Sequence, residues 1–124
     1  DINAYSLLPF MISSDLLISE ASSSIFEFAA LDKPIVWCDF FNLRWSYKGP
    51  FHYRLTRRMD QDILKFSDIG AHAENYGQLK SVVDDQLRHP QMFREKRRAY
   101  CDLFVGPGDG RSAVRVVDYL MSHA

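Results

Sequence analysis

Residues 19–24, which read SEASSS, are the segment of this chain best suited to bind a phosphate group. They follow a short apolar run at 16–18 and precede apolar residues at helical spacing. In an open parallel sheet, ligands bind beyond the carboxyl ends of the strands, where a helix start offers free amides and a positive dipole end. Serine hydroxyls are small and can donate further hydrogen bonds to phosphate oxygens. On this interpretation Ser22, Ser23 and Ser24, with Glu20 beside them, form a phosphate-binding turn.

The same residues also allow a purely structural interpretation. Ser24 and Glu27 have the spacing of a capping box, in which each side chain bonds the backbone amide of the other residue. Such boxes are common at helix starts, so composition alone favours capping over phosphate binding. Capping leaves Ser22 and Ser23 without an explanation, and both interpretations stay open at this point.

Two further groups of residues could contact a substrate. Asp39 follows the apolar run at 35–38 and could orient a hydroxyl group, although a cap for the next turn is the commoner role. Arg54, Arg57 and Arg58 lie among aromatic residues and could hold a polyanionic acceptor through bidentate phosphate contacts. A solvated loop is the more frequent meaning of such a cluster.

A basic stretch near the end of the chain suggests a surface helix. Arg94, Lys96, Arg97 and Arg98 could touch an anionic membrane surface. Because Glu95 lies among them and aromatic residues lie opposite, we expect an ordinary exposed helix face instead.

The composition limits what else the chain can be. It has 124 residues, a net charge of -1 and 47% hydrophobic residues, which fits one compact domain and gives no sign of nucleic-acid binding. Cys38 and Cys101 lack metal-type or redox-type spacing, so we expect free thiols and no metal site. The apolar runs are too short to span a bilayer and no leader pattern opens the chain. Because the chain does not begin with Met, we interpret it as a piece of a larger protein.

The pattern of apolar residues predicts an α/β fold with two or three parallel strands and more helices than strands. A strand buried on both faces reads as a short apolar run, and the runs at 16–18 and 35–38 enclose a short helix as a βαβ unit. The expected strands are 16–18, 35–38 and a weaker one at 69–73, and the expected helices are 3–14 with a bend at Pro9, 24–31, 75–88, 91–104 and 112–122. The residues expected to face the core are Tyr76, Leu79, Val83 and Leu87, then Phe93, Tyr100 and Phe104, then Val114, Val117 and Met121.

Two sequence segments resemble a signature of the CDP-glycerol:poly(glycerophosphate) glycerophosphotransferases, which make teichoic acids and related capsule polymers. These are residues 14–28, SDLLISEASSSIFEF, and residues 31–36, LDKPIV. Residues 108–112 and 116–118 resemble the closing turn and final helix of the same family. The resemblance implies the Rossmann-like C-terminal half of a GT-B fold, a cytoplasmic location with peripheral contact at the membrane as an option, and paired serines near a nucleotide diphosphate.

The resemblance also implies what the chain lacks. The family's catalytic histidines lie upstream of the matching region, so His52, His72, His89 and His123 are expected to be surface or loop residues. We therefore predict no catalytic residue, no cofactor and an inactive isolated chain, with a CDP-activated donor, a polymer or lipid-linked acceptor and the upstream domain as partners.

The sequence departs from the family pattern in two places, and this keeps alternatives open. Glu20 and Ala21 replace the usual aspartate and aromatic or hydroxyl residue, and residues 47–51 replace a more regular segment. Glycerol, ribitol or a sugar could therefore be the transferred group. Another GT-B enzyme, such as a UDP-sugar glycosyltransferase or an epimerase, is the first alternative, and a non-catalytic flavodoxin-like module is the second.

Overall fold

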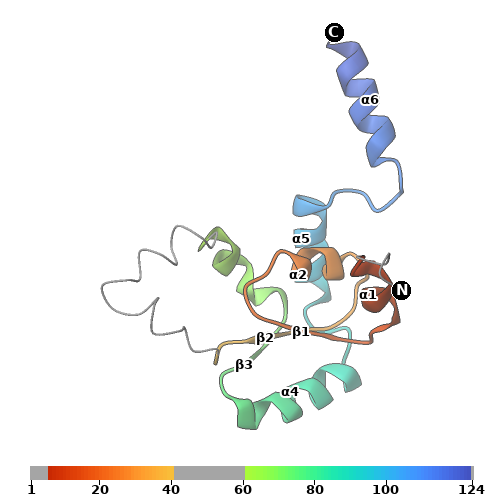
Figure 1. Ribbon diagram of the computed structural model, residues 1–124. Helices are drawn as coiled ribbons and strands as arrows, with labels where there is room; N and C mark the ends of the chain where they lie inside the picture. Colours follow the sequence, from red (N-terminus) through yellow and green to blue (C-terminus); the bar gives the residue numbers. More distant parts are fainter. Residues whose placement is uncertain (1–5, 41–60, 124) are drawn as a thin grey trace.

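A parallel sheet of three strands lies at the centre of the computed structural model, which describes residues 6–40 and 61–123 (Figure 1). The strands β1 (Leu17–Ser19), β2 (Ile35–Cys38) and β3 (Ala71–Ala73) lie side by side in that order. All four residues of β2 are buried, as expected for a central strand covered by helices on both faces. The predicted α/β class and the parallel sheet are confirmed.

The register of the strands aligns three side chains in one row. Ser19 pairs with Trp37, and Trp37 pairs with His72. This row lies at the end of the sheet where the strands terminate, which we call the carboxyl edge. A Cβ atom at Gly70 would lie 2.3 Å from the carbonyl oxygen of Ile35, so β3 can approach β2 at this point only because residue 70 is glycine.

Helices cover both faces of the sheet (Figure 1). On one face α2 (Ser24–Ala29) packs on α5 (Arg94–Phe104), with η3 (Gln61–Ile69) and α1 (Leu8–Ser13) beside them, and α4 (Tyr76–Arg88) covers the other face. The core between the sheet and the first layer consists of Met11, Ile25, Phe26, Phe28, Ala29, Ile35, Trp37 and Ile69. Aromatic contacts extend this core to Phe66 and Phe104, whose ring centroids lie 4.7 Å apart.

The helices differ from the predictions at their ends and in the faces they bury. Pro9 occupies the first turn of α1, where proline is favoured, so the helix begins there and does not bend. On α4 the residue that is fully buried is Gln86. Leu79 and Val83 of the predicted inner face are half-buried, whereas Tyr76 and Leu87 are exposed, so that prediction is correct only in part. Helix α5 begins only at Arg94, because the backbone of Phe93 is left-handed with φ of 58°.

The predicted basic face of α5 is wrong for Arg97, whose side chain is fully buried. Its guanidinium donates to the carbonyl oxygens of Met92 at 2.6 Å and Pro90 at 2.7 Å, and to the Asp32 carboxylate at 3.2 Å. Burial lowers the pKa of this guanidinium, and the charge of Asp32 opposes that shift. Arg97 therefore joins the turn before α5 to the turn that follows α2.

Asp32 also forms ion pairs with two other arginines of α5. Arg94 lies 3.0 Å and Arg98 3.2 Å from its second oxygen. Asp32 itself adopts a left-handed backbone with φ of 52°, a conformation that aspartate tolerates better than most residues. The turn that ends α2 is thus fixed by charge as well as by backbone geometry.

Replacing the buried arginine should destabilise the chain far more than replacing an exposed one. We expect Arg97→Leu to lower the free energy of unfolding by about 3 kcal/mol, since it removes the donor from one oxygen of the partly buried Asp32 carboxylate and from two carbonyls. Arg98→Ala is the matched control, because Arg98 bonds the same carboxylate from a side chain that is 66% exposed, and we expect a loss below about 1 kcal/mol. Urea unfolding measures both, and similar losses for the two variants would contradict the assignment.

Helix α6 (Ser112–Ser122) has the predicted bounds but not the predicted burial. None of its residues is buried, and it projects away from the remainder of the described structure (Figure 1). Val114, Val117 and Met121, which we expected to face inward, are all exposed. The linker before the helix contains Gly106 and Gly110, both with positive φ.

Removing α6 should leave the stability of the domain nearly unchanged. Because the helix buries no side chain against the sheet layers, we expect truncation after Gly110 to change the free energy of unfolding by less than about 0.5 kcal/mol. Urea unfolding of the truncated and complete chains measures the difference. A loss of several kcal/mol would mean that α6 packs on the domain in solution.

Candidate functional site

The serine turn, residues 20–24, connects the carboxyl end of β1 to α2 and is organised by its own hydroxyl groups. The hydroxyl oxygens of Ser22 and Ser24 lie 2.9 Å apart, and the amide of Ser24 lies 3.4 Å from the hydroxyl oxygen of Ser22. The amides of Ile25 and Phe26 donate to the carbonyls of Ser22 and Ser23, both at 3.1 Å. These hydrogen bonds make Ser23 the capping residue of α2, one residue before the capping position that the sequence predicted.

The predicted capping box of Ser24 and Glu27 is wrong. Helix α2 begins at Ser24, so Ser23 occupies the capping position, and its side chain makes no capping hydrogen bond. A capping box would require Ser24 to lie outside the helix with an extended backbone. The structural explanation for the serines is therefore weaker than composition alone indicated.

Ser23 is the most available group of the turn. It is exposed, and neither its hydroxyl nor its amide has a hydrogen-bond partner among the residues that the structure describes. Helix α2 has six residues, so the dipole contributes less here than it would at the start of a long helix. Direct hydrogen bonds from Ser23 are the main means by which this turn can hold an anion.

Asp39 and His72 form a second polar group on the carboxyl edge. Nδ1 of His72 lies 2.7 Å from Oδ2 of Asp39, and Nε2 lies 2.9 Å from the carbonyl oxygen of Ser67 in η3. The imidazole ring also stacks on Trp37, with 6.1 Å between the ring centroids. His72 is a surface residue with a side chain that is 37% exposed, as one of the two expected alternatives has it, but it lies in a strand and has fixed partners.

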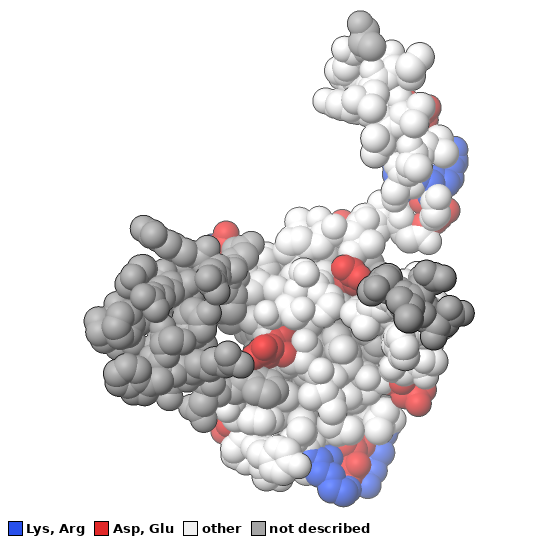
Figure 2. Space-filling model, viewed as in Figure 1, with Lys and Arg blue, Asp and Glu red and all other residues white. Residues whose placement is uncertain are grey.

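The charge of this edge is negative in the described part of the chain. Burial raises the pKa of the Cys38 thiol, and the charges of Asp39 and Glu20 raise it further, so both carboxylates act on the same buried group. The predicted cationic partners for a polyanion, Arg54, Arg57 and Arg58, lie outside the described residues. On the face seen in Figure 2, lysine and arginine gather at the lower right and on α6.

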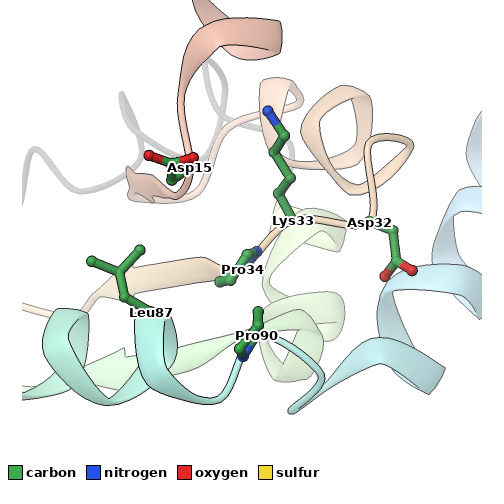
Figure 3. A pocket seen from close by; sticks show the side chains of 6 residues that line it. All are labelled: Asp15, Asp32, Lys33, Pro34, Leu87 and Pro90. Atoms are coloured by element: carbon green, nitrogen blue, oxygen red, sulfur yellow. The ribbon is translucent and has the colours of Figure 1, made fainter.

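A cavity of about 330 Å³ lies at the opposite edge of the sheet, and two of its charged residues, Asp32 and Lys33, are bound by other parts of the chain (Figure 3). Its lining residues are Asp15, Asp32, Lys33, Pro34, Leu87 and Pro90. The Lys33 ammonium group donates to the carbonyls of Ile12 and Ser14, both at 2.6 Å, and Asp32 is bound by arginines of α5. We therefore assign the candidate site to the carboxyl edge.

A comparison with protein-family models identifies the family of this chain. The model described as CDP-Glycerol:Poly(glycerophosphate) glycerophosphotransferase matches residues 1–122. The chain belongs to this family. No curated protein and no solved structure gave a match. The glycerophosphotransferase family is the one that the resemblance predicted, in preference to a UDP-sugar enzyme or a flavodoxin-like module.

Two further properties of the described residues concern metal binding and membrane crossing. Among residues 6–40 and 61–123, no three His, Cys, Asp or Glu side chains are grouped so that they could hold a metal ion. Within the same ranges no helix has the length and apolar character needed to cross a membrane.

The Asp39–His72 pair is not evident when the two residues are considered separately in the sequence. Taken alone, Asp39 is predicted to cap a turn or to orient a hydroxyl group, and His72 is predicted to be a surface or loop residue. The predicted strands do contain the information. If the strands at 35–38 and 69–73 are parallel neighbours, Asp39, which follows the strand at 35–38, lies beside the end of the strand at 69–73. The strand register is the missing step, because it decides which face each side chain occupies.

Cys38 can report on the two carboxylates of the site. In a Cys101→Ser background, we expect the thiolate absorbance of Cys38 to appear with a midpoint above the ordinary thiol value of roughly 8.5. Glu20→Gln or Asp39→Asn should lower that midpoint, because removing a negative charge favours the thiolate, while burial keeps the pKa raised. Glu95→Gln on α5 is the control. A midpoint that none of the site variants moves would show that the carboxylates lie farther from Cys38.

Proposed function

We propose that the serine turn binds the diphosphate of a CDP-activated donor, and that this chain is the nucleotide-binding portion of a transferase that moves glycerophosphate or a related group to a cell-wall or capsule polymer. The observation that supports this most directly is that the hydroxyl and amide of Ser23, in the turn after β1, have no hydrogen-bond partner among the described residues. The membership of the chain in a family named for CDP-glycerol supports the same donor.

The wider architecture of the proposal is the C-terminal, Rossmann-like part of a GT-B fold, with residues 1–124 as one domain. Among the described strands β1 has only one neighbour, and Ile18 on it is 48% exposed. Parallel sheets normally bury both faces and contain more strands, so this free edge is suited to further strands of the parent protein. The serine turn would then lie in the crevice between β1 and such a strand.

The chemistry proposed for this turn is electrostatic. An acceptor hydroxyl attacks the phosphorus that carries the glycerol, the P–O bond to CMP breaks, and negative charge develops on the departing nucleotide. Hydrogen bonds from Ser22, Ser23 and the amide of Ser24 would stabilise that charge where it forms. The base that takes the proton of the acceptor belongs to another part of the parent protein, so the isolated chain is expected to be inactive.

The proposed location is the cytoplasm, with contact at the inner face of the membrane made through a lipid-linked acceptor. Helix α5 gives little support to direct membrane binding, because its basic residues are already paired. Lys96 bonds Asp68 at 2.5 Å, and the three arginines of α5 bond Asp32.

Ser23→Ala separates phosphate binding from capping. In the full-length protein we expect it to weaken CDP-glycerol binding about 10-fold, the effect of losing one hydrogen bond to a charged group. The free energy of unfolding should change by less than about 0.5 kcal/mol, because the hydroxyl of Ser23 has no partner among the described residues. Adding Ser22→Ala should weaken binding further and cost some stability, since Ser22 contacts Ser24.

Calorimetric titration with CDP-glycerol measures the binding, and Ser81→Ala on α4 is the matched control, because its hydroxyl bonds Gln78 within its own helix. Unchanged nucleotide affinity together with lost stability would favour a purely structural role for the turn. Displacement of the donor only by UDP-sugars would favour the glycosyltransferase alternative.

A further inference from the structure

The Asp39 carboxylate is held in one orientation by a chain of contacts. His72 bonds its Oδ2, and the ring of His72 is itself fixed by the Ser67 carbonyl and by stacking on Trp37. The Ser67 oxygen can only accept, so Nε2 of His72 donates to it. The Asp39 carboxylate is likewise an acceptor, so both contacts are hydrogen bonds only when each ring nitrogen carries a hydrogen, and no N–H group of His72 is then left for a ligand.

The other oxygen of Asp39 is available. Oδ1 has no hydrogen-bond partner among the residues that the structure describes, and the side chain is 38% exposed. An ionised carboxylate only accepts hydrogen bonds, and it repels phosphate oxygens. The group that suits Oδ1 is therefore a neutral donor, such as a hydroxyl.

The position of Asp39 relates it to the serine turn. Ser19 and Trp37 are paired across neighbouring strands, which lie about 5 Å apart, and Asp39 follows Trp37 by two residues on the same side of the strand. Glu20, the first residue of the serine turn, acts on Cys38 together with Asp39. A ligand with its diphosphate on the serine turn can therefore direct the group attached to that diphosphate toward Asp39.

We propose that Asp39 accepts a hydrogen bond from a hydroxyl of the transferred group, a polyol, and that His72 is the positioning residue that orients Asp39 for this contact. The inference rests on the proposed function, because it assumes that the diphosphate lies on the serine turn. Glu20 is the less suitable acceptor, since no hydrogen bond orients its carboxylate within the described residues. Asp39 is thus a specificity determinant that distinguishes a donor carrying a polyol from the bare nucleotide.

The test compares two ligands, CDP-glycerol and CDP, in calorimetric titrations of the full-length protein. We expect Asp39→Ala to weaken CDP-glycerol binding about 10-fold or more and to change CDP binding less than about 3-fold, because only the first ligand carries the polyol. Asp15→Ala removes the same charge before β1, at the opposite edge of the sheet, and should change neither affinity.

The variants of His72 test its positioning role. His72→Ala should reduce the preference for CDP-glycerol over CDP, and His72→Gln should restore part of it, because the glutamine amide can donate to Asp39. A general loss of folding would lower both affinities together and leave the preference unchanged.

The outcomes separate this inference from the function on which it rests. If Asp39→Ala weakens both ligands equally, or neither, the polyol contact is wrong while nucleotide binding stands. If the unaltered protein binds neither ligand, the proposed function itself is wrong, and the polyol contact is wrong with it.

Discussion

The buried guanidinium of Arg97 is the interaction on which the arrangement of this domain depends. It is fully buried and connects two turns that are far apart in sequence, the one after α2 and the one before α5. Each end of this connection has a left-handed residue, Asp32 on one side and Phe93 on the other. A bulky residue such as Phe93 adopts that backbone conformation only at a cost in free energy, and the hydrogen bonds of Arg97 to the neighbouring carbonyls offset it. The position of α5 over α2 follows from this contact.

The carboxyl edge of the sheet and the opposite edge, which we call the amino edge, differ in whether their polar groups have hydrogen-bond partners within the chain. At the amino edge, Lys33 and Asp32 have their hydrogen-bonding capacity filled by carbonyls and arginines of the same chain. At the carboxyl edge, Ser23 and one oxygen of Asp39 have no partner among the described residues. Asp32 and Lys33 are therefore occupied by contacts within the chain, whereas Ser23 and Asp39 lie at the edge where open parallel α/β sheets generally bind ligands.

Most of the elements could be predicted from the sequence, because each has a local signal. The four buried residues of β2 form an uninterrupted apolar run, and the Asp-Lys-Pro sequence that follows α2 prevents the helix from continuing.

The buried faces of the helices are harder to predict. Gln86 and Arg97 are buried although their types suggest exposure, and α6 is exposed although its pattern is amphipathic. Burial of this kind depends on long-range partners such as Asp32, which local periodicity does not contain. The candidate site follows the same rule: the serine turn is predicted from its residue types, whereas the Asp39–His72 contact depends on the strand register.

The backbones of β2 and β3 approach each other closely at Gly70, and this contact between main chains fixes the geometry of the carboxyl edge. His72 reaches Asp39 because two backbones touch two residues earlier, where no side chain intervenes. Exchanges among the apolar core side chains that do not touch His72 can therefore alter the packing of the helices while the histidine and the carboxylate keep their separation. The alignment of this pair would instead be lost through a single added methyl group at residue 70, which would meet the backbone of Ile35.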